Sequence, residues 1–228
     1  MAARPPAARL ELSDMLLVGL TFGSGAVDAI SFLGLGRVFT ANMTGNIVIL
    51  GLAVGSRAGA ELVRSAASLV AFVIGVFIAS RFADRLSSGR PWPSGVRFAL
   101  GLEIVAQVAF LVGWLSSAGR PGEALEAVLV GFFGVAMGLQ TGAVAALGVA
   151  GISTTYVTGT LTGLIRSLAT GKGSGADWRR RTGVLAALLI GAACSGLLVV
   201  DARQVAPVLP LAVTALVLGA ALSARSSS

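Results

Sequence analysis

The stretch LGLGRVFTANMTGNIVIL, residues Leu33–Leu50, decides the fold because a related stretch recurs later in the chain. Residues Leu147–Leu164 read LGVAGISTTYVTGTLTGL, so a leucine–glycine pair and two threonines recur at an offset of 114 residues, half of the 228 in the chain. Each copy is rich in hydroxyl and amide groups within very hydrophobic surroundings. In membrane transporters, duplicated units with a polar, glycine-containing break commonly mark the substrate path. We therefore expect two internal repeats, about 15–115 and about 124–222, and a transport function.

Composition identifies the class of protein. Hydrophobic residues make up 55% of the chain, charged residues make up 12%, and the mean hydropathy is +0.89. A soluble domain carries roughly 25% charged residues, so this chain is an integral membrane protein. A net charge of +7 would favour nucleic acid as a partner of a soluble protein. Here it reflects the Lys and Arg enrichment of cytoplasmic loops, so we expect membrane lipids as partners and no nucleic acid.

The missing residue types restrict the chemistry. The chain has no histidine, which excludes imidazole metal sites and histidine-based catalytic triads. Its single cysteine, Cys194, cannot form an intrachain disulfide or a thiolate metal cluster. Neither glycine-rich phosphate-binding pattern, GxxxxGK[ST] or a strand-linked GxGxxG, is present. We expect no metal and no cofactor, and we do not expect an enzyme.

Eight hydrophobic segments follow one another along the chain. Six of them approach or exceed the 17 residues or so needed to cross a bilayer core of about 30 Å. The second and sixth segments are shorter, at about 15 residues each, and they contain the duplicated stretches. Each is either a short span or a re-entrant half-helix buried within protein. The segments are Met15–Leu35, Thr40–Val54, Leu62–Phe82, Val96–Leu115, Ala124–Leu147, Thr154–Leu168, Thr182–Val200 and Val205–Ala221.

Loop charges distinguish six spans from eight. With a cytoplasmic N-terminus, only six spans place both dense basic clusters, Arg81–Arg97 and Arg166–Arg181, on the cytoplasmic side. We therefore favour six spans plus two short polar helices and keep eight spans as the alternative. Three crossings per repeat invert one half relative to the other, whereas four leave the halves parallel. The predicted fold is an all-α polytopic membrane protein: a cytoplasmic segment 1–14, one membrane domain 15–222 and a tail 223–228, with both termini cytoplasmic.

Two acidic residues lie well inside predicted spans. Asp28 lies on one helical face with Ser24 and Ser31, and Glu103 has Gln107 four residues further on. A carboxylate at the bilayer centre costs about 2.5–3.5 kcal/mol on insertion scales, so such residues usually face a cavity or a partner. We predict that Asp28 and Glu103 couple transport to protons or act as counter-charges for a cation. The alternative is a protonated carboxylic acid hydrogen-bonded to a neighbouring helix.

The duplicated stretches supply the predicted solute site. Amides and hydroxyls can replace the water shell of a solute, and glycine allows close approach. Gln140, late in the fifth segment, is expected to face the region of Asp28, where it would contact solute or hold the two halves together. The alternative for the whole set is close helix packing with interhelical hydrogen bonds. The predicted solute-binding residues are Asn42, Thr44, Gly45, Asn46, Gln140, Tyr156, Thr158, Gly159 and Thr160.

These stretches resemble the YoaK-like family of uncharacterised bacterial multipass membrane proteins. The similarity runs from Thr21 through VFTANMTGN at Val38–Asn46 to STTYVTGT at Ser153–Thr160. One departure is Thr141-Gly142 after Gln140, where an Asn-Ala pair or a similar one is expected. The resemblance implies a bacterial plasma (inner) membrane location and identifies no substrate.

We therefore expect a small-solute transporter or permease with a polar site at the repeat interface. Two other functions stay open: a non-transporting membrane scaffold or sensor, and an intramembrane enzyme. A sealed, dry repeat interface would favour the scaffold, and hydrogen-bond contact between Asp28 and Glu103 would favour the enzyme. Association into a homo-oligomer is left open.

Overall fold

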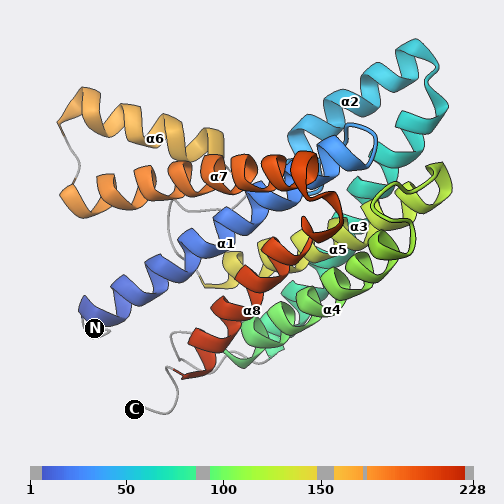
Figure 1. Ribbon diagram of the computed structural model, residues 1–228. Helices are drawn as coiled ribbons and strands as arrows, with labels where there is room; N and C mark the ends of the chain where they lie inside the picture. The colour runs from blue at the N-terminus through green and yellow to red at the C-terminus, as the bar shows by residue number, and fades with distance from the viewer. Residues whose placement is uncertain (1–6, 86–92, 148–156, 172–173, 224–228) are drawn as a thin grey trace.

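The computed structural model describes residues 7–85, 93–147, 157–171 and 174–223, and these residues are helical almost throughout (Figure 1). Helices form because long apolar runs contain few residues that interrupt backbone hydrogen bonding, and a bilayer requires those bonds to close within each segment. In chain order the described elements are α1 (Ala7–Gly34), α2 (Met43–Ser56), α3 (Gly59–Arg85), α4 (Ser94–Ser116), α5 (Glu123–Ala146), α6 (Val157–Thr170), α7 (Gly175–Asp201), the 3-10 turn η1 (Arg203–Val205) and α8 (Val208–Ser223).

Within these ranges, six segments are long and apolar enough to cross a membrane, as the sequence predicts. They lie in α1, α3, α4, α5, α7 and η1–α8. The short helices α2 and α6 contain 14 residues each. At 1.5 Å per residue they are about 21 Å long, which is less than the hydrocarbon thickness. The prediction of an all-α membrane protein with six spans and two short helices is confirmed.

The short helices point toward opposite ends of the molecule (Figure 1). α2 packs against α3 and runs from the middle of the bundle to the end where α3 begins. α6 packs against α7 and runs from the middle to the end where α7 begins. The N-termini of both short helices therefore lie near the middle of the molecule, and their C-termini lie toward its two ends.

The long helices pack in a reciprocal pattern. α1 packs against α7 and α8, whereas α5 packs against α3 and α4. Glycines bring the backbones together: a Cβ on Gly25 would collide with the Leu188 carbonyl of α7, and one on Gly138 would collide with the Phe72 carbonyl of α3. Small residues at such crossings are typical of membrane helix pairs, since they allow close van der Waals contact.

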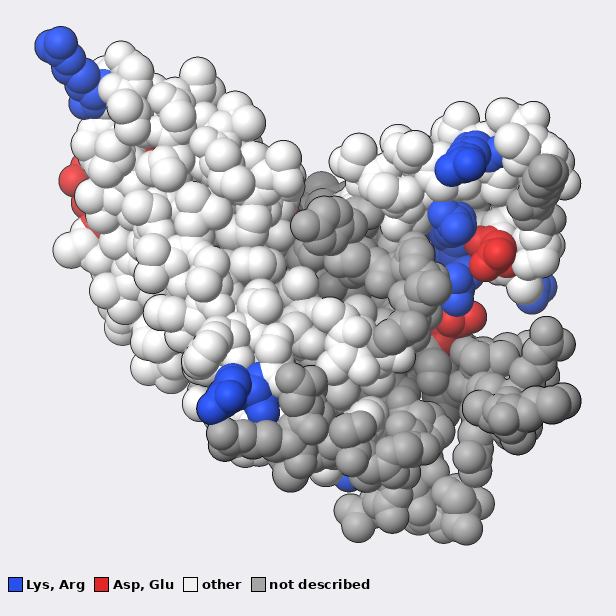
Figure 2. All heavy atoms as spheres, turned by 180° about the vertical axis from the view of Figure 1, so that it is seen from behind, with Lys and Arg blue, Asp and Glu red and all other residues white. Residues whose placement is uncertain are grey.

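Aromatic side chains fill the core where α4 meets α5. Phe110 stacks on Phe133 with ring centroids 3.4 Å apart, and Trp114 stacks on Phe110 from the next turn of α4. All three side chains are buried. Outside the core, many large apolar side chains are exposed, as expected for surfaces that face lipid. On the face drawn in Figure 2, charged side chains lie around the periphery, with a broad uncharged surface between them.

The helix boundaries differ most from the sequence prediction at the starts of α1 and α7, and α7 begins at Gly175 where the predicted segment begins at Thr182. α1 begins at Ala7, so part of the predicted cytoplasmic segment 1–14 continues the first span as helix. A change in hydrophobicity does not end a helix, because helices continue into water when no residue interrupts their hydrogen bonding. At the other end, α8 stops at Ser223, next to the predicted tail.

Candidate functional site

A cavity of about 1230 Å³ lies where the N-termini of α2 and α6 meet four of the spans. Its walls come from α1, α2, α3, α5, α6 and α7, together with the segment that connects α1 to α2. Most lining side chains are apolar, and the three phenylalanines Phe32, Phe39 and Phe72 are among them. Asp28 is the one charged residue among the lining residues that the structure describes. The cavity thus combines a single carboxylate with a largely hydrophobic wall.

Asp28 is held in place by the backbone of the segment between α1 and α2. Its Oδ1 accepts hydrogen bonds from the N–H groups of Thr40, at 2.8 Å, and Ala41, at 2.7 Å. One turn further along α1, the Ser31 and Thr40 hydroxyls form a hydrogen bond of 3.0 Å. Two residues of the predicted face, Asp28 and Ser31, therefore hold the connecting segment, whereas Ser24 bonds α5 through Gln140.

Asn46 was predicted to contact solute, but it is absent from the cavity wall. Its side chain is fully buried, and its Oδ1 accepts the N–H of Phe39 at 2.9 Å. Its Nδ2 donates to the Phe39 carbonyl and to the Ser68 hydroxyl of α3. These bonds use the amide within the protein, so we correct the assignment: Asn46 holds the connecting segment against α2 and α3.

The first turn of α2 does line the cavity. Asn42, Met43, Thr44 and Gly45 contribute to its wall, as the sequence predicts for three of the four. The Asn42 side chain also caps the helix, because its Oδ1 accepts the N–H of Gly45 at 3.3 Å. A Cβ on Gly45 would collide with the ring of Phe39, which explains the glycine at this position.

The second copy of the polar stretch contributes less. Thr158, at the start of α6, lines the cavity beside Val157. Gly159 is exposed with open space around it, and Thr160 is buried away from the cavity wall. Tyr156 lies outside the described residues. Of the four predicted residues in this copy, the structure thus brings Thr158 to the cavity.

Gln140 joins α5 to α1. Its Nε2 donates to the Ser24 hydroxyl at 2.7 Å and to the Leu20 carbonyl at 3.2 Å, and the side chain is 1% exposed. Of the two roles considered for Gln140, this geometry favours joining the two halves. The next residue, Thr141, lines the cavity, and its hydroxyl has no hydrogen-bond partner within the described part of the chain.

Glu103 occupies a separate buried cluster between α4 and α8. Its Oε1 accepts from Gln107 Nε2 at 2.9 Å and from the Thr214 hydroxyl at 3.1 Å. Its Oε2 has no partner among the described residues, and neither has the side-chain oxygen of Gln107. Glu103 is not part of the cavity wall, and no hydrogen bond within the described residues joins it to Asp28. The two acids predicted to act together therefore belong to two different sites.

The aromatic part of the cavity wall was not predicted from the sequence. Phe32 and Phe39 stack with ring centroids 5.1 Å apart, and both line the cavity with Phe72 of α3. An aromatic residue in an apolar helix gives no sign of whether it faces lipid, core or cavity. The position of Phe39 next to the polar stretch was the one available signal.

These features define a polytopic α-helical membrane protein with an open cavity that contains a carboxylate. Residues 16–221 match the family described as "Protein of unknown function (DUF1275)", and the chain belongs to this family. It is also 41% identical over 158 residues to the UPF0700 transmembrane protein YoaK of Bacillus subtilis (strain 168), across 68% of this chain and 67% of that protein. The resemblance to YoaK-like proteins is thereby confirmed. No solved structure matches the chain.

Proposed function

We propose that this protein is a small-solute transporter that binds its solute in the cavity beside Asp28. The observation that carries the proposal is the position of this carboxylate, in a large cavity at the inner ends of two oppositely directed short helices. Discontinuous helices that end near mid-membrane form the substrate sites of many secondary transporters. A membrane scaffold has no need of such a cavity, so transport is the better explanation.

The chemistry of the wall supports a particular class of solute. Phenylalanine faces attract cations as well as apolar groups, and the Asp28 carboxylate supplies a counter-charge within the hydrophobic wall. The hydroxyls of Thr44, Thr141 and Thr158 add a few hydrogen-bonding groups around it. We infer a small amphipathic solute that carries a positive charge.

Asp28 is also the proposed proton-coupling residue. Its Oδ1 accepts from the N–H groups of Thr40 and Ala41, and the backbone N–H of Asn42 also hydrogen-bonds the carboxylate. A proton and a cationic solute that enter from the cavity would compete for this carboxylate, and that competition would couple their movements. Glu103, with an unpartnered Oε2 in its buried cluster, is the second proposed proton site.

An inverted internal repeat would provide the two states that transport requires. The reciprocal packing of α1 with α7 and α5 with α3 supports such a repeat, as do the opposite directions of α2 and α6. In known transporters with this arrangement, one repeat moves against the other around a fixed central site. We place the protein in a bacterial inner membrane with both termini cytoplasmic, as the basic clusters favour.

The test is uptake of the fluorescent cation ethidium into proteoliposomes, with and without a proton gradient. We expect Asp28→Asn to fold but to lose gradient-driven uptake, because the amide keeps the acceptor oxygen and cannot titrate. Asp201→Asn, at an exposed acid at the end of α7, is the matched control and should transport normally. Normal ethidium accumulation by Asp28→Asn would overturn the role of this carboxylate. Failure of the native protein to take up ethidium, while it accumulates a neutral or anionic solute, would overturn the proposed solute class.

A further inference from the structure

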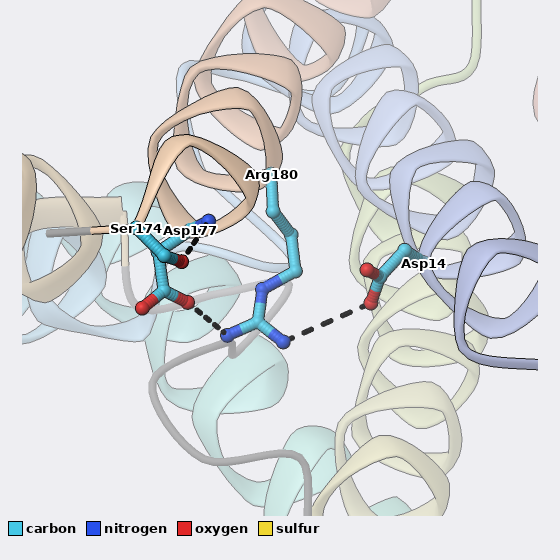
Figure 3. Close-up of polar contacts among 4 residues, drawn as sticks. All are labelled: Asp14, Ser174, Asp177 and Arg180. Carbon is cyan, nitrogen blue, oxygen red and sulfur yellow. Dashed lines mark hydrogen bonds and ion pairs between the residues drawn. The ribbon is translucent and has the colours of Figure 1, made fainter. Parts of the chain in front are cut away.

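Two ion pairs tie helices together at opposite ends of the molecule. Arg64 on α3 binds Glu126 on α5, with 2.8 Å between guanidinium nitrogen and carboxylate oxygen. Arg180 on α7 approaches Asp14 on α1 at 3.8 Å (Figure 3). In both cases the arginine lies in the first turns of the helix that follows a short helix, α2 or α6. Its partner lies in a long helix of the other half of the chain.

The two arginines lie at the same distance along the chain from a glycine at a helix crossing. Arg64 precedes Gly75 of α3 by eleven residues, and Arg180 precedes Gly191 of α7 by eleven residues. Eleven residues are about three helical turns, so each arginine lies on the same helical face as its glycine. A Cβ on either glycine would collide with the backbone of the partner helix. Each arginine therefore lies about 16 Å along its helix from a close helix crossing.

The acids also precede a glycine at a helix crossing, at distances that differ by one residue. Asp14 precedes Gly25 of α1 by eleven residues, and Glu126 precedes Gly138 of α5 by twelve. Gly25 lies at the crossing of α1 with α7, and Gly138 at the crossing of α5 with α3. The α1–α7 and α3–α5 pairs thus have the same arrangement, with a glycine crossing in the middle and an ion pair at one end.

A second acid accompanies each arginine. Asp177 lies three residues before Arg180, and Glu61 lies three residues before Arg64. Arg180 contacts Asp177 at 3.3 Å, and Ser174 caps the helix by accepting the Asp177 N–H (Figure 3). An acid on the same helix gives the arginine a partner when it leaves the acid on the other helix. Exchange of partners keeps the arginine paired, while the acid on the other helix loses its partner.

The two ion pairs differ in the distance between their charged atoms and in exposure to solvent. The Arg64–Glu126 pair is the shorter one, and its side chains are 11% and 19% exposed. At the other end, the Arg180 and Asp14 side chains are 21% and 37% exposed, and the guanidinium is shared with Asp177. One end of the molecule is thus tightly joined while the equivalent end is looser.

We propose that the two ion pairs are alternating latches that control access to the cavity from the two membrane faces, an inference that rests on the proposed transport function. The Arg64–Glu126 pair holds the α2–α3 hairpin against α5, and the Arg180–Asp14 pair holds the α6–α7 hairpin against α1. Both hairpins contribute to the cavity wall. Release of a latch lets its hairpin turn about the glycine crossing and opens the cavity at that end. Arg180 then turns to Asp177, and Arg64 to Glu61.

The experiment measures access to the cavity and needs no solute. Ala29→Cys, on the cavity wall beside Asp28, reports access in a Cys194→Ala background. A membrane-impermeant thiol reagent is applied to right-side-out and to inside-out vesicles, and the labelling rate is compared between the two. We expect Arg64→Gln to raise labelling from the α2–α3 end, and Arg180→Gln to raise it from the opposite end, by about fivefold or more.

Several variants serve as controls. Arg57→Gln and Arg179→Gln remove exposed arginines close to each latch and should leave labelling unchanged. The exchanged pair, Arg64→Glu with Glu126→Arg, should restore the native rate. Arg64→Lys and Arg180→Lys keep the charge but lose the guanidinium geometry, so they should give a smaller increase on the same faces. If a glutamine variant does not fold, the corresponding lysine variant is measured in its place.

The outcomes separate this inference from the proposed function. Changes confined to the expected faces support the latches even if no solute is transported, in which case the transport proposal fails alone. Solute uptake by the native protein together with unchanged labelling in both arginine variants overturns the latches and leaves transport standing. Equal changes at both faces also overturn the inference, since they indicate general loosening of the bundle.

Discussion

The side-chain amide of Asn46 pairs with both backbone groups of Phe39, so one residue fixes the segment between α1 and α2. That segment supplies the Thr40 and Ala41 N–H groups that orient the Asp28 carboxylate. Asn46 therefore acts on the cavity indirectly, by holding the backbone that holds Asp28. Its neighbour Asn42, four residues earlier, faces the cavity directly.

The first prediction concerns this buried amide. Asn46→Ala leaves the N–H of Phe39 without its partner, which costs about 1–3 kcal/mol for an unpaired group in a protein interior. The Phe39 carbonyl loses one donor and keeps the Ser68 hydroxyl. We expect a clearly lowered melting temperature in detergent, with lost uptake following from lost structure. Asn42→Ala removes an exposed helix cap, which costs only about 1 kcal/mol, and should reduce uptake more than stability. Equal melting temperatures for Asn46→Ala and the native protein would contradict the structural role.

The two asparagines also mark the limit of what the sequence predicts about the site. Residues four apart share a helix face, so the sequence assigns Asn42 and Asn46 the same role. In the structure Asn42 is the N-cap, and the preceding segment folds back over Asn46. The course of that segment depends on long-range contacts, such as those of Asp28 and Ser68 with its backbone, which spacing does not reveal. Polar composition identifies this stretch in the sequence, but the contacts of each residue within it depend on the three-dimensional structure.

At the scale of elements, glycine crossings fix how the spans pair. Gly75 of α3 and Gly138 of α5 lie against one another, and a Cβ on either would meet the other's Cα. The apolar lengths that predict the spans depend on each segment alone, which is why six spans could be predicted. The choice of partner helix depends on matching small residues in two distant segments, and the chain contains 31 glycines. The reciprocal packing of α1 and α5 was therefore beyond the sequence analysis.

The second prediction tests one crossing against a matched control on the same helix. Gly138→Ala places a methyl group against the Phe72 carbonyl of α3, and overpacking of this kind typically costs about 1–3 kcal/mol. Gly131→Ala, two turns earlier on α5, meets open space and should be neutral or slightly stabilising. The measurement is the midpoint of thermal unfolding for both variants in one detergent. A fall of the same size in both variants would show that the crossing at Gly138 is not the cause.

At the scale of the whole molecule, the short helices determine how the chain lies in the membrane. Because α2 and α6 are too short to cross, the α2–α3 and α6–α7 junctions fall at opposite ends of the bundle. The start of α1 and the end of α8 lie together at the end where α7 begins (Figure 1). The dense basic cluster Arg179–Arg181 also lies at the start of α7. Positive charge favours the cytoplasmic side, so we predict that the α2–α3 junction lies outside the cell.

The last prediction follows from that orientation. In a Cys194→Ala background, Ser56→Cys at the end of α2 should react with an impermeant thiol reagent in intact cells. Ala176→Cys, exposed at the start of α7, should be shielded until the membrane is permeabilised. If α2 and α6 crossed the membrane, both positions would be cytoplasmic and both would be shielded. Labelling of Ala176→Cys alone would show that the chain is inserted the other way round, with the Arg64–Glu126 latch on the cytoplasmic face.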